Sequence, residues 1–179
     1  MKRFIPRPIT AIAVLVFACV SVVAISMSIA GLNVSKGSGN AVGKVIARGG
    51  DDTTSVINTT FERLPGSLVR VSVPNGRTAL LTARFSAQSV CTEGTGTQYC
   101  QVRVLFDGQP GSPSSTEGDI FDSTDGGTES FGSYESHAID RFQTVDEGIH
   151  TVEVQTSVSS AKTQLLLTNW ALIVERSLK

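Results

Sequence analysis

The sequence predicts an all-β fold, an antiparallel two-sheet sandwich of the jelly-roll type, preceded by an apolar N-terminal helix. Three observations predict it. Apolar and polar residues alternate after about residue 55, for example in 68–73 and 152–155. Turn-forming Asp, Asn and Gly recur between the alternating stretches. No stretch beyond the N-terminal apolar segment shows the 3.6-residue period of a helix.

The spacing of these stretches predicts the individual strands. Seven or eight short antiparallel strands in about 120 residues are typical of a two-sheet sandwich. The last strand is apolar on both faces until its charged end, so we expect it to be central, with Trp170 in the core. The expected strands lie near 56–62, 67–73, 77–91, 99–106, 119–123, 134–144, 149–158 and 163–176.

The N-terminal segment predicts export. No charged residue occurs from Pro8 through Ser35, and Lys2, Arg3 and Arg7 precede this stretch. A secretory signal cleaved after Ala30 fits the small residues Ser28 and Ala30. A retained membrane anchor also fits, because 9–32 as a helix would span roughly 36 Å. Lipidation at Cys19 is a third alternative. In each case the rest of the chain lies outside the cell or on the outer face of the cytoplasmic membrane.

The domain organisation follows from this segment. We expect a signal peptide or anchor at 1–30, a flexible glycine-rich linker at 31–55 and a β-sandwich domain at 56–179. Without residues 1–30 the chain keeps 12 of its 15 basic and all 16 acidic side chains, a formal net charge of −4. Nucleic acid is therefore not an expected partner, and a membrane is expected only through an uncleaved N-terminal segment.

Two cysteines remain outside the apolar stretch, and they predict a disulfide. An even pair in an exported chain, Cys91 and Cys100, is expected to be oxidised. If the two lie opposite each other in a hairpin, Phe85 pairs with Phe106 on the same apolar face. Arg84 then lies opposite Asp107 on the polar face. A register that separates apolar from polar residues in this way predicts the hairpin and a core Phe85–Phe106 pair.

An acidic segment is the first candidate site. Ten acidic residues and a single basic one, Arg141, lie between Asp107 and Glu147. Flexible acidic loops can supply the oxygen ligands of calcium, and Asp119, Asp122 and Asp125 are the candidates here. The spacing does not match an EF-hand loop, and a solvated acidic rim is the alternative. No other cofactor is expected.

The two histidines are the second candidate site. His137 and His150 flank a hairpin expected to turn at 146–148, which would place them roughly 20 Å apart, too far to share a metal. Ser136, His137 and Asp140 cannot converge as a catalytic triad, because neighbouring side chains of a strand point to opposite faces. Glu135 and His137 do share a face, so a hydrolase built on them and the acidic loops is a further alternative.

Six motifs follow one another along the chain: LLTARFSAQSVC, CQVRVLFDG, FDSTD, ESHAIDR, TVEVQ and LTNWALIVER. Their order resembles that in a group of uncharacterised secreted bacterial β-sandwich proteins. The resemblance runs from about Thr60 to Arg176 and implies the fold and export, but no activity and no site. More distantly, the strand pattern is similar to carbohydrate-binding and trimeric jelly-roll modules. That more distant similarity is at the level of the fold alone.

The function expected from the sequence is therefore that of a non-enzymatic, exported binding or structural module. Its partner would be an extracellular glycan, a wall polymer, a protein or further copies of the chain. Loops at the ends of a sandwich commonly carry binding, so the acidic loops at 107–133 are the expected contact surface. The alternatives are a calcium-dependent adhesion module using those loops and, less favoured, a hydrolase.

Overall fold

The computed structural model describes residues 39–92, 94–114 and 117–179, and within these ranges the regular structure is entirely β. The apolar helix expected at 1–30 lies outside the described residues. Within them, no helix is long and apolar enough to cross a membrane. The strands are β1 (Val42–Gly50), β2 (Thr54–Val56), β3 (Glu62–Arg63), β4 (Val69–Val73), β5 (Ala79–Thr92), β6 (Tyr99–Phe106), β7 (Gln109–Pro110), β8 (Asp119–Ser123), β9 (Glu135–Val145), β10 (Gly148–Val158) and β11 (Gln164–Leu178).

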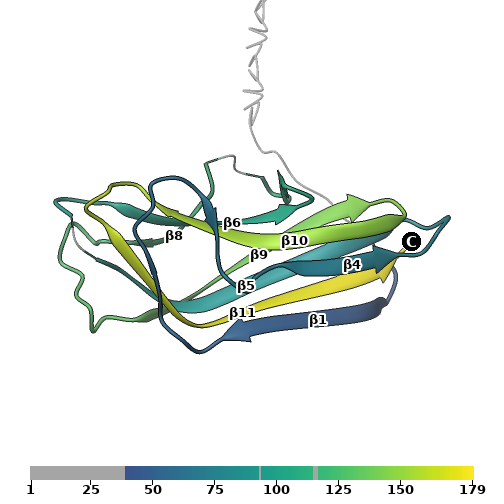
Figure 1. Cartoon of the computed structure of the whole chain (residues 1–179), viewed down its shortest axis with the longest axis horizontal. Helices are drawn as coiled ribbons and strands as arrows, with labels where there is room; N and C mark the ends of the chain where they lie inside the picture. The colour runs from purple at the N-terminus through teal and green to yellow at the C-terminus, as the bar shows by residue number, and fades with distance from the viewer. Residues whose placement is uncertain (1–38, 93, 115–116) are drawn as a thin grey trace, which may run out of the picture. The chain divides into compact units, whose positions relative to one another are not determined.

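The strands form two antiparallel sheets that pack face to face. Sheet A has the order β1-β11-β5-β9, with β2 also pairing with β11. Sheet B has the order β3-β10-β6-β7, with β4 pairing with β10 and β8 pairing with β6. In Figure 1 the ribbons of β6 and β10 run above those of β5, β11 and β1. The expected all-β, two-sheet fold is confirmed, and β11 is a central strand as predicted.

The core lies between the two inner faces. Phe85 is fully buried, and its ring centroid lies 5.6 Å from that of Phe121 and 6.4 Å from that of Trp170. Phe106 and Leu172 belong to the same buried cluster. Alternate residues of β5 and β11 enter this core while the residues between them face solvent, which is the period-two pattern of a half-buried strand. Trp170, which is 6% exposed, is a core residue as expected.

The disulfide forms, but the hairpin predicted around it is wrong. Cys91 and Cys100 are bonded, with their Cα atoms 5.9 Å apart. However, β5 pairs with β9 and β11 in sheet A, whereas β6 pairs with β7, β8 and β10 in sheet B. The bond therefore joins the two sheets. Phe85 and Phe106 are both in the core as predicted, but they come from opposite sheets and do not pair within a sheet.

The linker predicted at 31–55 is also wrong from Val42 onward. β1 pairs with β11 along its length, and Ile46 packs against the core. The glycines that suggested a tether have a packing role here. A Cβ atom at Gly50 would lie 2.6 Å from Nε1 of Trp170, so only glycine lets this strand pass so close to the indole. Residues 31–38 lie outside the described residues.

The strand predicted at 56–62 is two short strands with a crossing between them. β2 pairs with β11 in sheet A and ends at Val56, and β3 pairs with β10 in sheet B and begins at Glu62. The chain therefore passes from one sheet to the other here. Phe61 lies in this crossing, and the guanidinium of Arg103 stacks over its ring on the outer face of sheet B. The guanidinium carbon is 4.1 Å from the centroid of the Phe61 ring.

Replacing both Cys91 and Cys100 by Ala is expected to lower the free energy of unfolding by about 2–3 kcal/mol, because the bond no longer restricts the unfolded chain. The measurement is urea denaturation of the double variant beside the oxidised parent. Reduced parent protein should match the variant. A variant as stable as the oxidised parent would contradict the account.

Phe85→Ala is expected to lower the free energy of unfolding by about 3–5 kcal/mol, because it leaves a cavity beside the rings of Phe121 and Trp170. Arg70→Ala on an exposed position of β4 is the control and should stay within about 0.5 kcal/mol of the parent. Both are checked by thermal and urea denaturation. A loss below about 1 kcal/mol at Phe85 would mean that the core is not packed as described.

Candidate functional site

Three elements bring polar side chains together beside the disulfide. Ser89 on β5 is two residues before Cys91 and so faces inward, toward sheet B. Its hydroxyl Oγ lies 2.6 Å from Oδ2 of Asp122, on β8, and 2.9 Å from Nδ1 of His137, on β9. Oδ2 of Asp122 and Nδ1 of His137 are 3.9 Å apart. We call Ser89, Asp122 and His137 the inner polar cluster.

The imidazole of His137 links this cluster to the surface. Its Nε2 lies 3.4 Å from a carboxylate oxygen of Glu135, whose side chain is 62% exposed. The ring of Phe121 meets the imidazole edge to face, with centroids 5.4 Å apart. Glu135 and His137 share a face of β9 as the sequence predicted, because they are two residues apart on one strand. The cluster therefore runs from the core edge to solvent.

The cluster contains the residue types of a catalytic triad but not its arrangement. Ser89 is fully buried, so no substrate can reach its hydroxyl in this structure. The hydroxyl contacts Asp122 and His137 at once, whereas in a triad the histidine stands between the serine and the carboxylate. Ser136 and Asp140, by contrast, lie on the face of β9 opposite to that of His137. The arrangement satisfies polar groups that the fold has buried.

A second carboxyl group extends the cluster and is unusually basic. Glu129 follows a turn in which the Thr124 carbonyl accepts hydrogen bonds from the amides of Gly127 and Thr128. Its Oε2 is buried and has no hydrogen-bond partner among the described residues. Burial, followed by repulsion from the carboxylate of Asp122, raises the pKa of Glu129 to about 7. This group therefore titrates near neutral pH.

The three calcium candidates do not come together. Asp119 forms an ion pair with Arg141, while Asp122 is 8% exposed and accepts the Ser89 hydrogen bond. Asp125 accepts a hydrogen bond from Oγ of Ser123 at 2.6 Å. Within 39–92, 94–114 and 117–179, no group of three or more His, Cys, Asp or Glu side chains is placed to hold a metal ion. Because Asp122 is buried, its place on the predicted acidic contact surface is wrong.

The two histidines lie in different sheets, so the simple hairpin expected between β9 and β10 is wrong. β9 belongs to sheet A and β10 to sheet B. His150 contacts the Asp107 carboxylate through Nδ1 at 2.7 Å, and its Nε2 is 2.9 Å from the Asp146 carbonyl. Burial acts to raise the pKa of Asp107, but hydrogen bonds from His150 and Thr151 outweigh it and leave that pKa below its usual value. Asp107 therefore fixes a turn and is not paired with Arg84.

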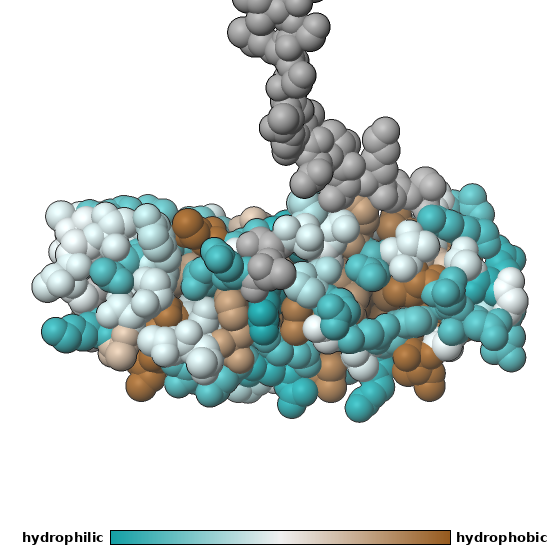
Figure 2. All heavy atoms as spheres, turned by 90° about the horizontal axis from the view of Figure 1, so that it is seen from above, coloured by the Kyte–Doolittle hydropathy of each residue, from teal (hydrophilic) through white to brown (hydrophobic). Residues whose placement is uncertain are grey.

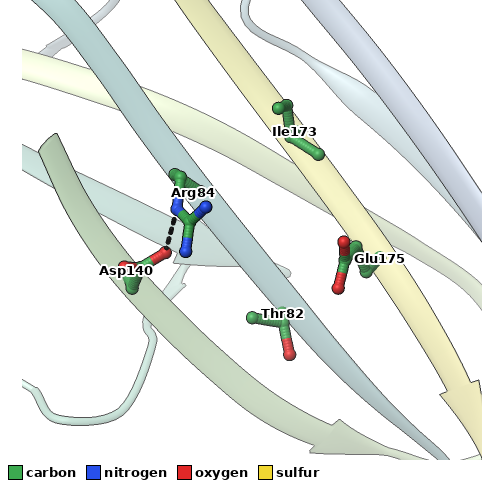
Figure 3. A pocket seen from close by; sticks show the side chains of 5 residues that line it. All are labelled: Thr82, Arg84, Asp140, Ile173 and Glu175. Atoms are coloured by element: carbon green, nitrogen blue, oxygen red, sulfur yellow. Dashed lines mark hydrogen bonds and ion pairs between the residues drawn. The ribbon is translucent and has the colours of Figure 1, made fainter. Parts of the chain in front are cut away.

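The outer face of sheet A carries a shallow pocket that the sequence did not single out. Thr82 and Arg84 of β5, Asp140 of β9, and Ile173 and Glu175 of β11 line it (Figure 3). Arg84 and Asp140 are direct partners across the strands, with Nε to Oδ1 at 2.8 Å. This hydrogen bond, with the attraction between the two charges, raises the pKa of Arg84. The alternation of apolar and polar residues in β5 and β11 could have indicated this pocket, because it places the four lining side chains of these strands on the outer face.

Apolar side chains on the surface are scattered. Figure 2 shows a mainly hydrophilic face on which separate hydrophobic residues interrupt the polar ones. Among the described residues, the exposed large hydrophobic side chains come from different strands and loops: Val42, Val45, Ile57, Tyr99, Ile120, Phe131, Tyr134 and Ile149. Isolated residues of this kind are ordinary on soluble surfaces and do not mark a site by themselves.

Comparisons with known proteins give no function. No protein-family model matches the chain, and no curated protein matches it. Among solved structures, the chain is similar to the crystal structure of dimeric latent PorU from Porphyromonas gingivalis, with a TM-score of 0.34 and 11% identity. The match covers 80% of this chain but 14% of that one. A likeness this small has no bearing on function.

Glu129→Gln is expected to change the pH dependence of stability. Native Glu129 keeps its proton up to about pH 7, whereas the unfolded group loses it near 4.5. Unfolding therefore releases this proton, and the contribution of Glu129 to stability falls as pH rises between these values. The free energy of unfolding of Glu129→Gln relative to the parent should thus increase from pH 5 to pH 8. Urea denaturation across this range tests it, and a constant difference would contradict it.

Proposed function

We propose that the chain is an exported, disulfide-braced and non-enzymatic β-sandwich of jelly-roll connectivity that binds another extracellular molecule through the outer face of sheet A. The partner class is that expected from the sequence: a glycan, a wall polymer or a protein. The contact surface is different, because the outer face of sheet A replaces the acidic loops at 107–133. The observation that carries the proposal is the pocket formed by Thr82, Arg84, Asp140, Ile173 and Glu175.

Two observations support export, one in the N-terminal segment and one in the sandwich. The charge-free stretch from Pro8 through Ser35, with basic residues before it, is typical of a signal or an anchor. The Cys91–Cys100 bond is buried between the sheets, and such bonds persist in oxidising compartments outside the cytoplasm. We therefore propose a location outside the cell or on the outer face of the cytoplasmic membrane.

Jelly-roll connectivity is supported by the strand orders. The eight longer strands are β1, β4, β5, β6, β8, β9, β10 and β11. Numbered one to eight along the chain, they give the order 1-8-3-6 in sheet A and 2-7-4-5 in sheet B. Strands that are neighbours in sequence thus alternate between the sheets, except four and five, as two Greek keys folded together require. β2, β3 and β7 are short additions to this frame.

Binding without catalysis is supported by where the polar groups lie. The inner polar cluster of Ser89, Asp122 and His137 uses its hydrogen bonds internally, and its only hydroxyl is fully buried. The polar groups of the pocket, by contrast, face solvent: the Arg84 and Asp140 side chains are 62% and 56% exposed. The calcium-dependent alternative finds no support in carboxylates that are already paired with Arg141, Ser89 and Ser123.

Thr82→Arg should block the proposed face. The long side chain would fill the pocket beside Glu175, while its solvent-facing position on β5 leaves the core unchanged. The labelled full-length protein is incubated with intact cells of the native host and with their purified wall material. We expect retention of Thr82→Arg to fall at least fivefold, with a melting temperature within a few degrees of the parent.

Ser72→Arg is the matched control, because Ser72 is an exposed residue of β4 in sheet B. It should be retained as well as the parent. Equal retention of the two arginine variants would overturn the assignment of the outer face of sheet A. Failure of the parent to bind either cells or wall material would overturn a binding role at the surface.

A further inference from the structure

We propose that the pocket on the outer face of sheet A takes an alkylammonium group, the side chain of a lysine on a protein partner. This inference rests on the proposed function, because it names the ligand of the same face. Three features of the pocket carry it: one carboxylate without a hydrogen bond or ion pair among the described residues, an aliphatic surface beside that carboxylate, and a net negative charge. Each is an observation on named residues of β1, β5, β9 and β11.

The charges of the pocket leave one carboxylate available. Arg84 and Asp140 satisfy each other through the 2.8 Å contact between Nε and Oδ1. Glu175 makes no hydrogen bond or ion pair with any residue in the part of the chain that the structure describes, although the charge of Arg84 acts on it at longer range. With one cationic and two anionic side chains, the pocket has a net charge of −1. A cationic ligand is therefore favoured and an anionic one is disfavoured.

Aliphatic groups stand on two sides of that carboxylate. Ile173 is two residues before Glu175 on β11, so both side chains point out of the same face, as Figure 3 shows. Val45 of β1 is the direct cross-strand partner of Glu175 and is 57% exposed. A ligand that reaches Glu175 therefore passes over apolar surface. A lysine matches this pattern, because its methylene stem packs on apolar groups while its ammonium stays polar.

The same residues disfavour a sugar as the ligand of this pocket. None of the five lining side chains is aromatic, so the lining itself gives a sugar no ring to stack on. Arg84 and Asp140 are already paired with each other through the contact between Nε and Oδ1. The ammonium of lysine is a compact point charge on a flexible four-carbon stem, so it can meet a carboxylate while the stem lies on apolar groups. Glu175, Ile173 and Val45 provide both.

The test is a titration of the full-length, ¹⁵N-labelled chain in a non-ionic detergent, followed by NMR. The probe is Nα-acetyl-lysine amide, and Nα-acetyl-norleucine amide is the uncharged control ligand of similar shape. We expect millimolar binding of the lysine amide, with shifts confined to amides around Thr82, Arg84, Asp140 and Glu175. The norleucine amide should bind more weakly, and higher ionic strength should weaken only the lysine amide.

Two variants, each of which removes one negative charge, test whether Glu175 is the group that binds the lysine amide. Glu175→Gln should weaken lysine-amide binding about two- to fivefold, the range expected for one solvent-exposed ion pair. Glu153→Gln, on β10 in sheet B, should leave the binding unchanged, because Glu153 pairs with Arg63 far from this face. Equal binding of the lysine and norleucine amides, or no effect of Glu175→Gln, would overturn the proposal.

A further ligand separates a protein partner from a free amine. n-Butylammonium carries the same charged group without the peptide amides. Tighter binding of the lysine amide supports a protein partner. Tighter binding of n-butylammonium overturns the proposal that the ligand is a lysine of a protein. If Thr82→Arg abolishes retention on cells while the lysine amide causes no shifts at the pocket, the binding face stands and the ligand class assigned here falls.

Discussion

The covalent bond between Cys91 and Cys100 fixes which sides of β5 and β6 face each other across the sandwich, and the placement of the other side chains of these two strands follows from it. Because the bond crosses the sandwich, the cysteine side of β5 must point toward the cysteine side of β6. That register sends Phe85 and Phe106 into the core. It also places Ser89 on the inner face, beside Asp122, and leaves Arg84 on the outer face. A shift of one residue would exchange these faces and expose the core.

The sequence predicted which face each residue of β5 and β6 occupies, but not which strand lies beside it. Alternation is a local property, and it is the same for a hairpin as for two strands facing each other across a core. The partner of Arg84 shows the difference. The hairpin register placed it opposite Asp107, whereas the structure pairs it with Asp140 of β9, 56 residues further along the chain. Asp107 instead contacts His150 of β10.

Features that depend on distant packing could not be read from the sequence. Glycines at 49 and 50 suggested a tether, and their role becomes visible only when Trp170 of β11 lies against them. The inner polar cluster likewise joins β5, β8 and β9. Asp122 is 33 positions from Ser89 along the chain, and His137 is 48 positions from it. The shared face of Glu135 and His137 was predictable, because two residues of one strand define it. The neighbours of that face were not, because they belong to other strands.

The inner polar cluster and the pocket on the outer face of sheet A differ in what they contribute to stability, and this difference favours binding at the pocket. Groups of the inner polar cluster are withdrawn from water, so losing a partner there leaves a buried polar atom unsatisfied and costs about 1–3 kcal/mol. The raised pKa of Glu129 is a consequence of the same environment. The Arg84–Asp140 pair faces solvent, where water and salt screen the attraction, so it contributes little to stability. Residues on the outer face of sheet A can therefore change with a ligand while the fold is kept, whereas Ser89 and Asp122 are held in place by the fold itself.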